Sequence, residues 1–131
     1  MGFYGLAVIY LLGVVVQFFL AGLGAFGATT YDAHRGVGLA LGLISLVLLV
    51  VAFVAKLPGS QLVLAVVLVV LNILQLFLGQ VDVDEVAALH AVNALAIAFV
   101  AYELVHRSRH YLVSKMASPK PEAGTRSKSA A

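Results

Sequence analysis

Two histidines at equivalent positions of a repeated pattern are the residues of this chain best suited to chemistry. His34 opens the segment HRGVGLALG and His90 opens HAVNALAIA, so each is followed four residues later by a small residue and then by Leu-Ala. A stretch with a glutamine precedes each histidine, VQFFLAGLG around Gln17 and LQLFLG around Gln75. Such internal similarity indicates a duplicated structural unit. Because a neutral imidazole is a good metal ligand, two imidazoles facing each other inside a bundle could hold one haem iron.

Long apolar runs must position these side chains. A hydrocarbon core about 30 Å thick needs a helix of roughly 17–25 residues, and only helices or closed barrels satisfy their backbone polar groups in lipid. The runs are continuous and lack the alternation of barrel strands. The sequence therefore predicts an all-α transmembrane four-helix bundle, up-down-up-down, with an internal two-helix repeat. Its helices are expected over roughly residues 3–27, 37–55, 62–78 and 86–105.

Charge distribution predicts domain limits and orientation. Most Lys and Arg residues follow the fourth run, whereas the loop 80–85 carries only acidic charges. Since short cytoplasmic segments are enriched in Lys and Arg, we expect a multi-pass protein of the cell membrane with both termini cytoplasmic. Residues 1–110 form the bundle, and residues 111–131 are a basic cytoplasmic tail whose composition predicts disorder. The first run is interpreted as a retained helix, with a cleaved signal peptide as the alternative, because no basic residue precedes it.

Small residues line the helix face below each histidine. Steps of three and four residues lead from His34 to Gly38 and Gly42, and from His90 to Ala94. Such stripes let helices pack closely, or they leave space for a flat macrocycle beside a ligating imidazole. The guanidinium of Arg35 either pairs with a haem propionate or is an exposed loop side chain. The expected site has His34 and His90 as metal ligands, with Arg35, Gly38, Gly42, Ala94, Gln17 and Gln75 around the cofactor.

The absence of cysteine limits how a cofactor could be held. It excludes disulfides, thiolate metal sites and covalent haem attachment through C-x-x-C-H. The expected cofactor is therefore haem b, bound without a covalent link. A second pair of histidines, His106 and His110, is spaced i, i+4 beyond the fourth run. With no third ligand evident nearby in the sequence, we interpret this pair as part of an interfacial basic cluster.

The repeated Gln and His pattern resembles two families. The segments QFFLAGLGAFG, YDAHRGVG, LQLFLG and VAALHAVNAL resemble an uncharacterised family of small four-span prokaryotic membrane proteins. More distantly, the chain is similar to one half-bundle of haem A synthase, whose halves carry haem-ligating histidines on their second and fourth helices. That resemblance implies that His34 and His90 are the axial pair. This chain has one such unit instead of two and no corresponding acidic residue in its first run, so synthase activity is not expected.

Three functional hypotheses follow. The first is a membrane protein that binds one haem b through two axial histidines and acts in electron transfer or haem handling, with a redox partner protein, a quinone or a second copy of the chain. The alternative is a cofactor-free structural or assembly subunit. A small transporter is the least favoured, because the acidic residues lie near helix ends. The sequence leaves open whether the chain is an enzyme and favours a protein that is not one by itself. The expected environment is the lipid bilayer, with no nucleic acid partner.

Overall fold

The computed structural model describes residues 2–81 and 83–117, and this part of the chain is helical without strands. Helices long and apolar enough to cross a membrane are α1, α2, α3 and the segment Asp84–Ala117, which contains α4 and α5. The predicted all-α fold with four transmembrane helices is thereby confirmed. The elements are α1 (Gly2–Ala25), α2 (Asp32–Val54), α3 (Gly59–Leu78), the single turn α4 (Asp84–Ala87) and α5 (Leu89–Ala117).

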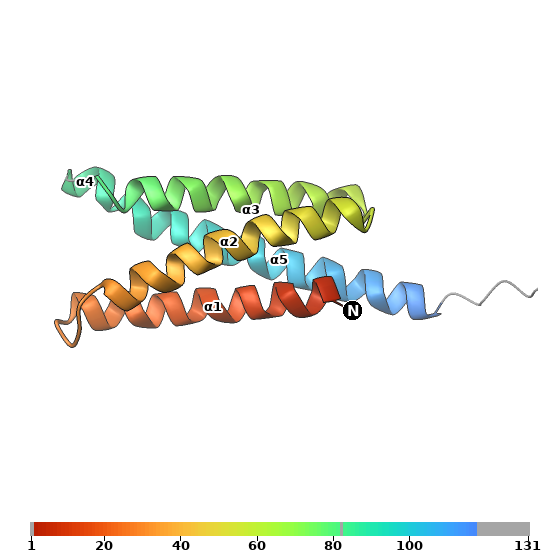
Figure 1. Cartoon of the computed structure of the whole chain (residues 1–131), viewed down its shortest axis with the longest axis horizontal. Coiled ribbons are helices and arrows are strands. Elements are labelled where there is room, and N and C mark those ends of the chain that lie inside the picture. The colour runs from red at the N-terminus through yellow and green to blue at the C-terminus, as the bar shows by residue number, and fades with distance from the viewer. Residues whose placement is uncertain (1, 82, 118–131) are drawn as a thin grey trace, which may run out of the picture.

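The long helices form a bundle in which α2 and α5 lie across from each other. Helix α1 packs against α2 and α5, and α3 packs against the same two helices. The connection between α1 and α2 lies at the same end of the molecule as α4, and the connection between α2 and α3 lies at the other end (Figure 1). We call the end with residues 26–31 and α4 the histidine end. The end with Gly2, residues 55–58 and Ala117 is the terminal end.

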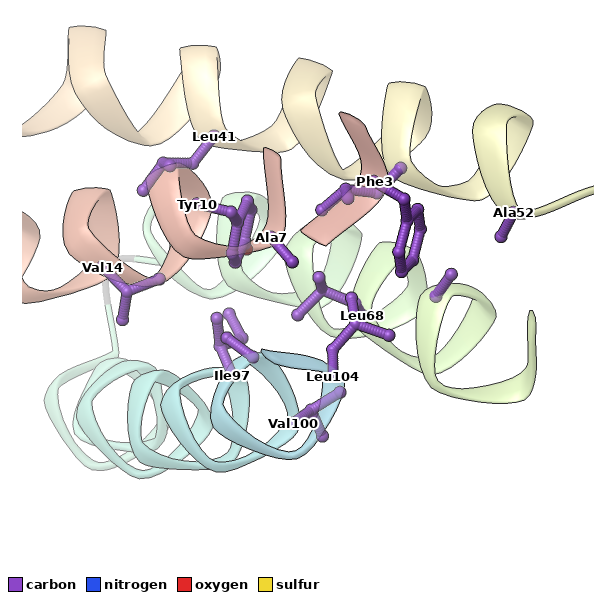
Figure 2. Packing of buried hydrophobic residues seen from close by; sticks show 13 residues of the cluster. Phe3, Ala7, Tyr10, Val14, Leu41, Ala52, Leu68, Ile97, Val100 and Leu104 are labelled. Atoms are coloured by element: carbon purple, nitrogen blue, oxygen red, sulfur yellow. The ribbon is translucent and has the colours of Figure 1, made fainter. Parts of the chain in front are cut away.

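The packed core is concentrated away from the histidine end. Helix α1 buries no residue after Val14, α2 buries none before Leu41, and α5 buries none before Asn93. Only α3 buries a residue close to the histidine end, Leu78. Figure 2 shows side chains of all four long helices meeting in the core cluster. Over the described residues, the buried apolar core therefore stops before the histidine end, where partly exposed side chains join the helices.

Bulky side chains fill this core. Leu48, Leu68 and Leu104 are almost completely buried. Many others do face outward, as expected when the solvent is hydrocarbon. Helix α5 continues to Ala117, so residues 111–117 are its last part, and residues 118–131 of the expected tail lie outside the described residues.

A buried hydrogen bond ties α1 to α3 across the middle of the bundle. The side-chain amide of Asn72 donates to the hydroxyl of Tyr10 at 2.7 Å and to the carbonyl oxygen of Leu68 at 2.7 Å. Tyr10 is 1% exposed and Asn72 is 8% exposed. Unpaired polar groups are costly in an apolar interior, so this contact favours one alignment of the two helices. Figure 2 shows the Tyr10 ring directed into the core from α1.

We predict that Tyr10→Phe destabilises the bundle by about 1 kcal/mol, the usual scale of an interhelical hydrogen bond in a membrane protein. The reason is loss of the Asn72–Tyr10 bond, while Asn72 keeps its bond to Leu68. The measurement is the free energy of unfolding in mixed micelles titrated with a denaturing detergent. Tyr102→Phe is the matched control because Tyr102 is 54% exposed. Equal effects of the two substitutions would contradict the assignment.

Candidate functional site

The structure brings His34 and His90 together across the bundle. Their ring centroids are 6.0 Å apart, and the ring planes make an angle of 57°. Both side chains are half-buried at the histidine end. A metal ion bound between two imidazole nitrogens, at about 2 Å from each, places the ring centroids roughly 6 Å apart. The separation between the rings thus suits a shared metal ion.

The His34 ring is oriented by the backbone of α1. Its Nδ1 lies 3.3 Å from the carbonyl oxygen of Gln17. Because a carbonyl oxygen only accepts hydrogen bonds, this contact favours the tautomer with the proton on Nδ1. The lone pair is then on Nε2, which is the arrangement found when a backbone carbonyl orients a metal-ligating histidine.

The His90 ring lies against the end of α3. A Cβ atom built on Gly79 would be 3.4 Å from both Cε1 and Nδ1 of His90, so the glycine allows the ring to approach closely. The Nδ1 atom is buried and makes no hydrogen bond of good geometry. The same Cβ would be 3.5 Å from the backbone carbonyl oxygen of Gln75, so this oxygen lies beside the ring. Each histidine therefore lies near the backbone carbonyl of the glutamine in the preceding helix, which is a structural counterpart of the sequence repeat.

The two glutamine side chains differ in their roles. The Gln75 Oε1 accepts a hydrogen bond of 2.6 Å from Asn93, whose Nδ2 also donates to the carbonyl oxygen of Leu71 at 2.9 Å. These bonds hold α5 against α3 just below His90. The amide of Gln17 instead lies against Gly38, where an added Cβ would be 2.7 Å from its Nε2. The Gln17 Oε1 is buried and has no hydrogen-bond partner.

The remaining predicted residues lie at different distances from the two rings. The Gln17 side chain occupies the space beside Gly38, as described above. Gly42 faces α3, because an added Cβ would be 4.0 Å from the Leu76 side chain. Ala94 is half-buried one turn below His90, and Arg35 is exposed at the start of α2. Gly38 and Gly42 thus lie beside side chains of neighbouring helices, and both interpretations of the small residues stay open. The surroundings of the two rings consist mainly of backbone and amide groups.

Tyr31 also belongs to this end of the molecule, and the sequence analysis did not include it in the expected site. Its ring contacts His34 edge-on, with centroids 6.2 Å apart. It also covers Gly24 of α1, where an added Cβ would be 2.5 Å from Cε1 of the ring. The signal that could have found this contact is the glycine itself, since a glycine near a helix end permits a close approach.

The donor set limits the chemistry. Among residues 2–81 and 83–117, no three His, Cys, Asp or Glu side chains gather as a metal cluster. A tetrahedral zinc site formed by the protein alone is therefore not supported by the described residues. Two imidazoles are enough for an iron whose other four ligands belong to a macrocycle.

Comparison with known proteins gives a family match for part of the chain. Residues 17–81, just under half of the chain, match a family of unknown function (DUF6220). This segment begins at Gln17, contains His34 and Gln75, and ends before His90. No curated protein and no solved structure matches the chain. The match supports similarity to an uncharacterised family, and the resemblance to haem A synthase stays a prediction.

We predict opposite effects for two alanine substitutions in α1. Gly22→Ala meets no atom within 4 Å and should stabilise the helix by up to about 1 kcal/mol through propensity. Gly24→Ala makes the same change but displaces the Tyr31 ring, so it should be less stable than Gly22→Ala by about 1 kcal/mol or more, the usual cost of overpacking. Unfolding free energies of the two variants provide the measurement. If Gly24→Ala is at least as stable as Gly22→Ala, Tyr31 does not rest on Gly24.

Proposed function

We propose that the chain binds one haem b at the histidine end, with His34 and His90 as its axial ligands. The observation that carries this proposal is the 6.0 Å separation of the two ring centroids across the bundle. Helices α2 and α5 are not neighbours in the bundle, so direct packing of the two helices does not account for the meeting of these side chains.

The position of the two rings relative to the packed core supports the proposal. The buried side chains of α1, α2 and α5 end at Val14, Leu41 and Asn93, and the two histidines lie beyond them. Both rings are therefore at the edge of the buried core. The orphaned Nδ1 of His90 and Oε1 of Gln17 lie in the same region. A polar, functional site is a common reason for such unsatisfied groups.

The proposed role of the protein is to hold and orient the ligands. The Gln17 carbonyl fixes the His34 ring with its Nε2 lone pair available. The exposed guanidinium of Arg35, next to the first turn of α2, is available to a propionate, and the helix N-terminus adds a favourable field for an anion. When bound, a haem with two protein ligands supplies one-electron redox chemistry and has no open position for oxygen. Electron transfer or haem handling therefore fits better than oxygen activation.

The membrane setting completes the proposal. We infer a cell-membrane location with both termini cytoplasmic, because Lys and Arg concentrate after the fourth span. The histidine end then lies toward the outer face. One site at one side of the bilayer needs a redox partner protein, a quinone or a second copy of the chain to pass electrons further.

The competing proposal is a cofactor-free structural or assembly subunit. It is supported by the contacts of Gln17 with His34 and Gly38, which also serve as ordinary interhelical packing. In that case the two histidines would be interface residues. Their substitution would disturb assembly with a partner, and no haem absorption would be there to change.

We predict that the protein purified in detergent, with haem supplied during expression or added afterwards, shows a Soret band. The spectrum should be that of a six-coordinate haem b, with one haem per chain. His34→Ala and His90→Ala should each change the spectrum to that of a five-coordinate haem or abolish the band, because each removes one axial ligand. Ultraviolet–visible absorption in both oxidation states provides the measurement.

The matched controls are His106→Ala and His110→Ala, which remove an imidazole at the terminal end and should leave the spectrum unchanged. A protein that stays colourless after haem addition would contradict the proposal and favour the structural subunit. A Soret band unaffected by both substitutions at the histidine end would also contradict the proposal, because the haem would then be held by other residues.

A further inference from the structure

A second histidine pair lies at the terminal end, outside the proposed haem site. His106 and His110 are one turn apart on α5, and their Nε2 atoms are 3.2 Å apart. Their rings meet edge-on, with centroids 4.6 Å apart. Both side chains are exposed, and both lie beyond the segment that matches the family.

The separation of the two nitrogens is the one that a shared metal ion requires. Two imidazole nitrogens bound to one tetrahedral ion, each at about 2.0–2.1 Å, lie roughly 3.3 Å apart. The i, i+4 spacing is also how a helix presents two histidines to one zinc ion in H-E-x-x-H sites. The pair is therefore arranged to chelate one ion of the imidazole-preferring class, which includes Zn²⁺, Cu²⁺ and Ni²⁺.

An independent observation comes from the opposing helix α3. The two histidines line a cavity of about 400 Å³ together with Gln61 of α3. Gln61 is 2% exposed, and its Oε1 is buried without a hydrogen-bond partner. A buried acceptor without a partner is destabilising, and a hydrogen bond from a water in the cavity would relieve that. The fold thus places a buried amide in the wall of this cavity, and the same amide also lines a neighbouring cavity with Phe3 and Ser108.

Neighbouring charges permit a cation here. Arg107 also lines the cavity, and its Nε donates to a carboxylate oxygen of Glu103 at 3.0 Å. The ion pair offsets the positive charge that would otherwise repel a metal ion from the adjacent imidazoles.

We propose that His106 and His110 form a binding site for one divalent transition-metal ion at the terminal end. The Gln61 carbonyl oxygen accepts a hydrogen bond from a water on that ion. With two protein ligands and water in the other positions, the site is open and exchanges its metal.

The test uses the full-length protein in detergent, with any polyhistidine tag removed. It is titrated with Zn²⁺, Cu²⁺ and Ni²⁺ as simple salts in a calorimeter. We expect one ion per chain, and nitrogen couplings from two imidazoles in the electron paramagnetic resonance spectrum of the Cu²⁺ form. His106→Ala and His110→Ala should each weaken binding by more than about 10-fold, and Gln61→Leu by about 10-fold, the usual effect of losing an outer-shell partner.

Because His106 and His110 are exposed, both alanine variants should fold as the unaltered protein does. Circular dichroism checks that their helix content is unchanged. Met116→Ala is the control, because Met116 is 72% exposed on α5 and lies outside the cavity, and it should retain the affinity of the unaltered protein. The proposal is overturned if none of the three metals binds saturably, or if the double variant His106→Ala/His110→Ala binds as tightly as the unaltered chain. Unchanged affinity in Gln61→Leu would remove Gln61 from the site.

Discussion

His34 and His90 meet across a diagonal of the bundle. Their meeting depends on which parts of the four long helices are packed against each other. The buried hydrogen bond between Tyr10 and Asn72 and the apolar side chains around it hold α1 and α3 together across the middle of the bundle. Toward the histidine end the buried core stops, and the side chains of His34 and His90 meet beyond it. In lipid, association of helices relies on close packing and interhelical polar contacts.

The two histidines have similar backbone surroundings, but the glutamines that precede them make different side-chain contacts. In both halves a glutamine backbone carbonyl lies near the histidine of the following helix. The glutamine side chains then diverge, because Gln75 pairs with Asn93 across α3 and α5 while Gln17 packs into the space beside Gly38. This division explains why the repeat is visible around the histidines and weak elsewhere. Backbone carbonyls are supplied by any residue, so only the positions that need a small side chain or an imidazole keep the pattern.

The sequence predicted the spans and the histidine pair because apolar length and residue type determine them directly. Four long apolar runs in a bilayer are best accounted for as spanning helices. Inward-facing histidines on two of these helices are then expected to lie near each other inside the bundle. It did not predict the Tyr10–Asn72 bond, since a tyrosine within an apolar run gives no sign of which helix it faces. It also missed that Gln61 lines the same cavity as His106 and His110, because this cavity lies between the start of α3 and the last part of α5. Contacts between elements distant in the chain depend on the rotation of each helix about its axis, which continuous hydrophobic runs hardly specify.

The central claim is that one iron is shared by the two imidazoles of the histidine end, and low-temperature electron paramagnetic resonance of the ferric protein tests it most directly. Two neutral imidazoles give a strong ligand field, so the account predicts a low-spin ferric signal. In His34→Ala and in His90→Ala this signal should be replaced by a high-spin one or lost with the haem. A high-spin signal from the unaltered protein, or a low-spin signal that survives both substitutions, would contradict it.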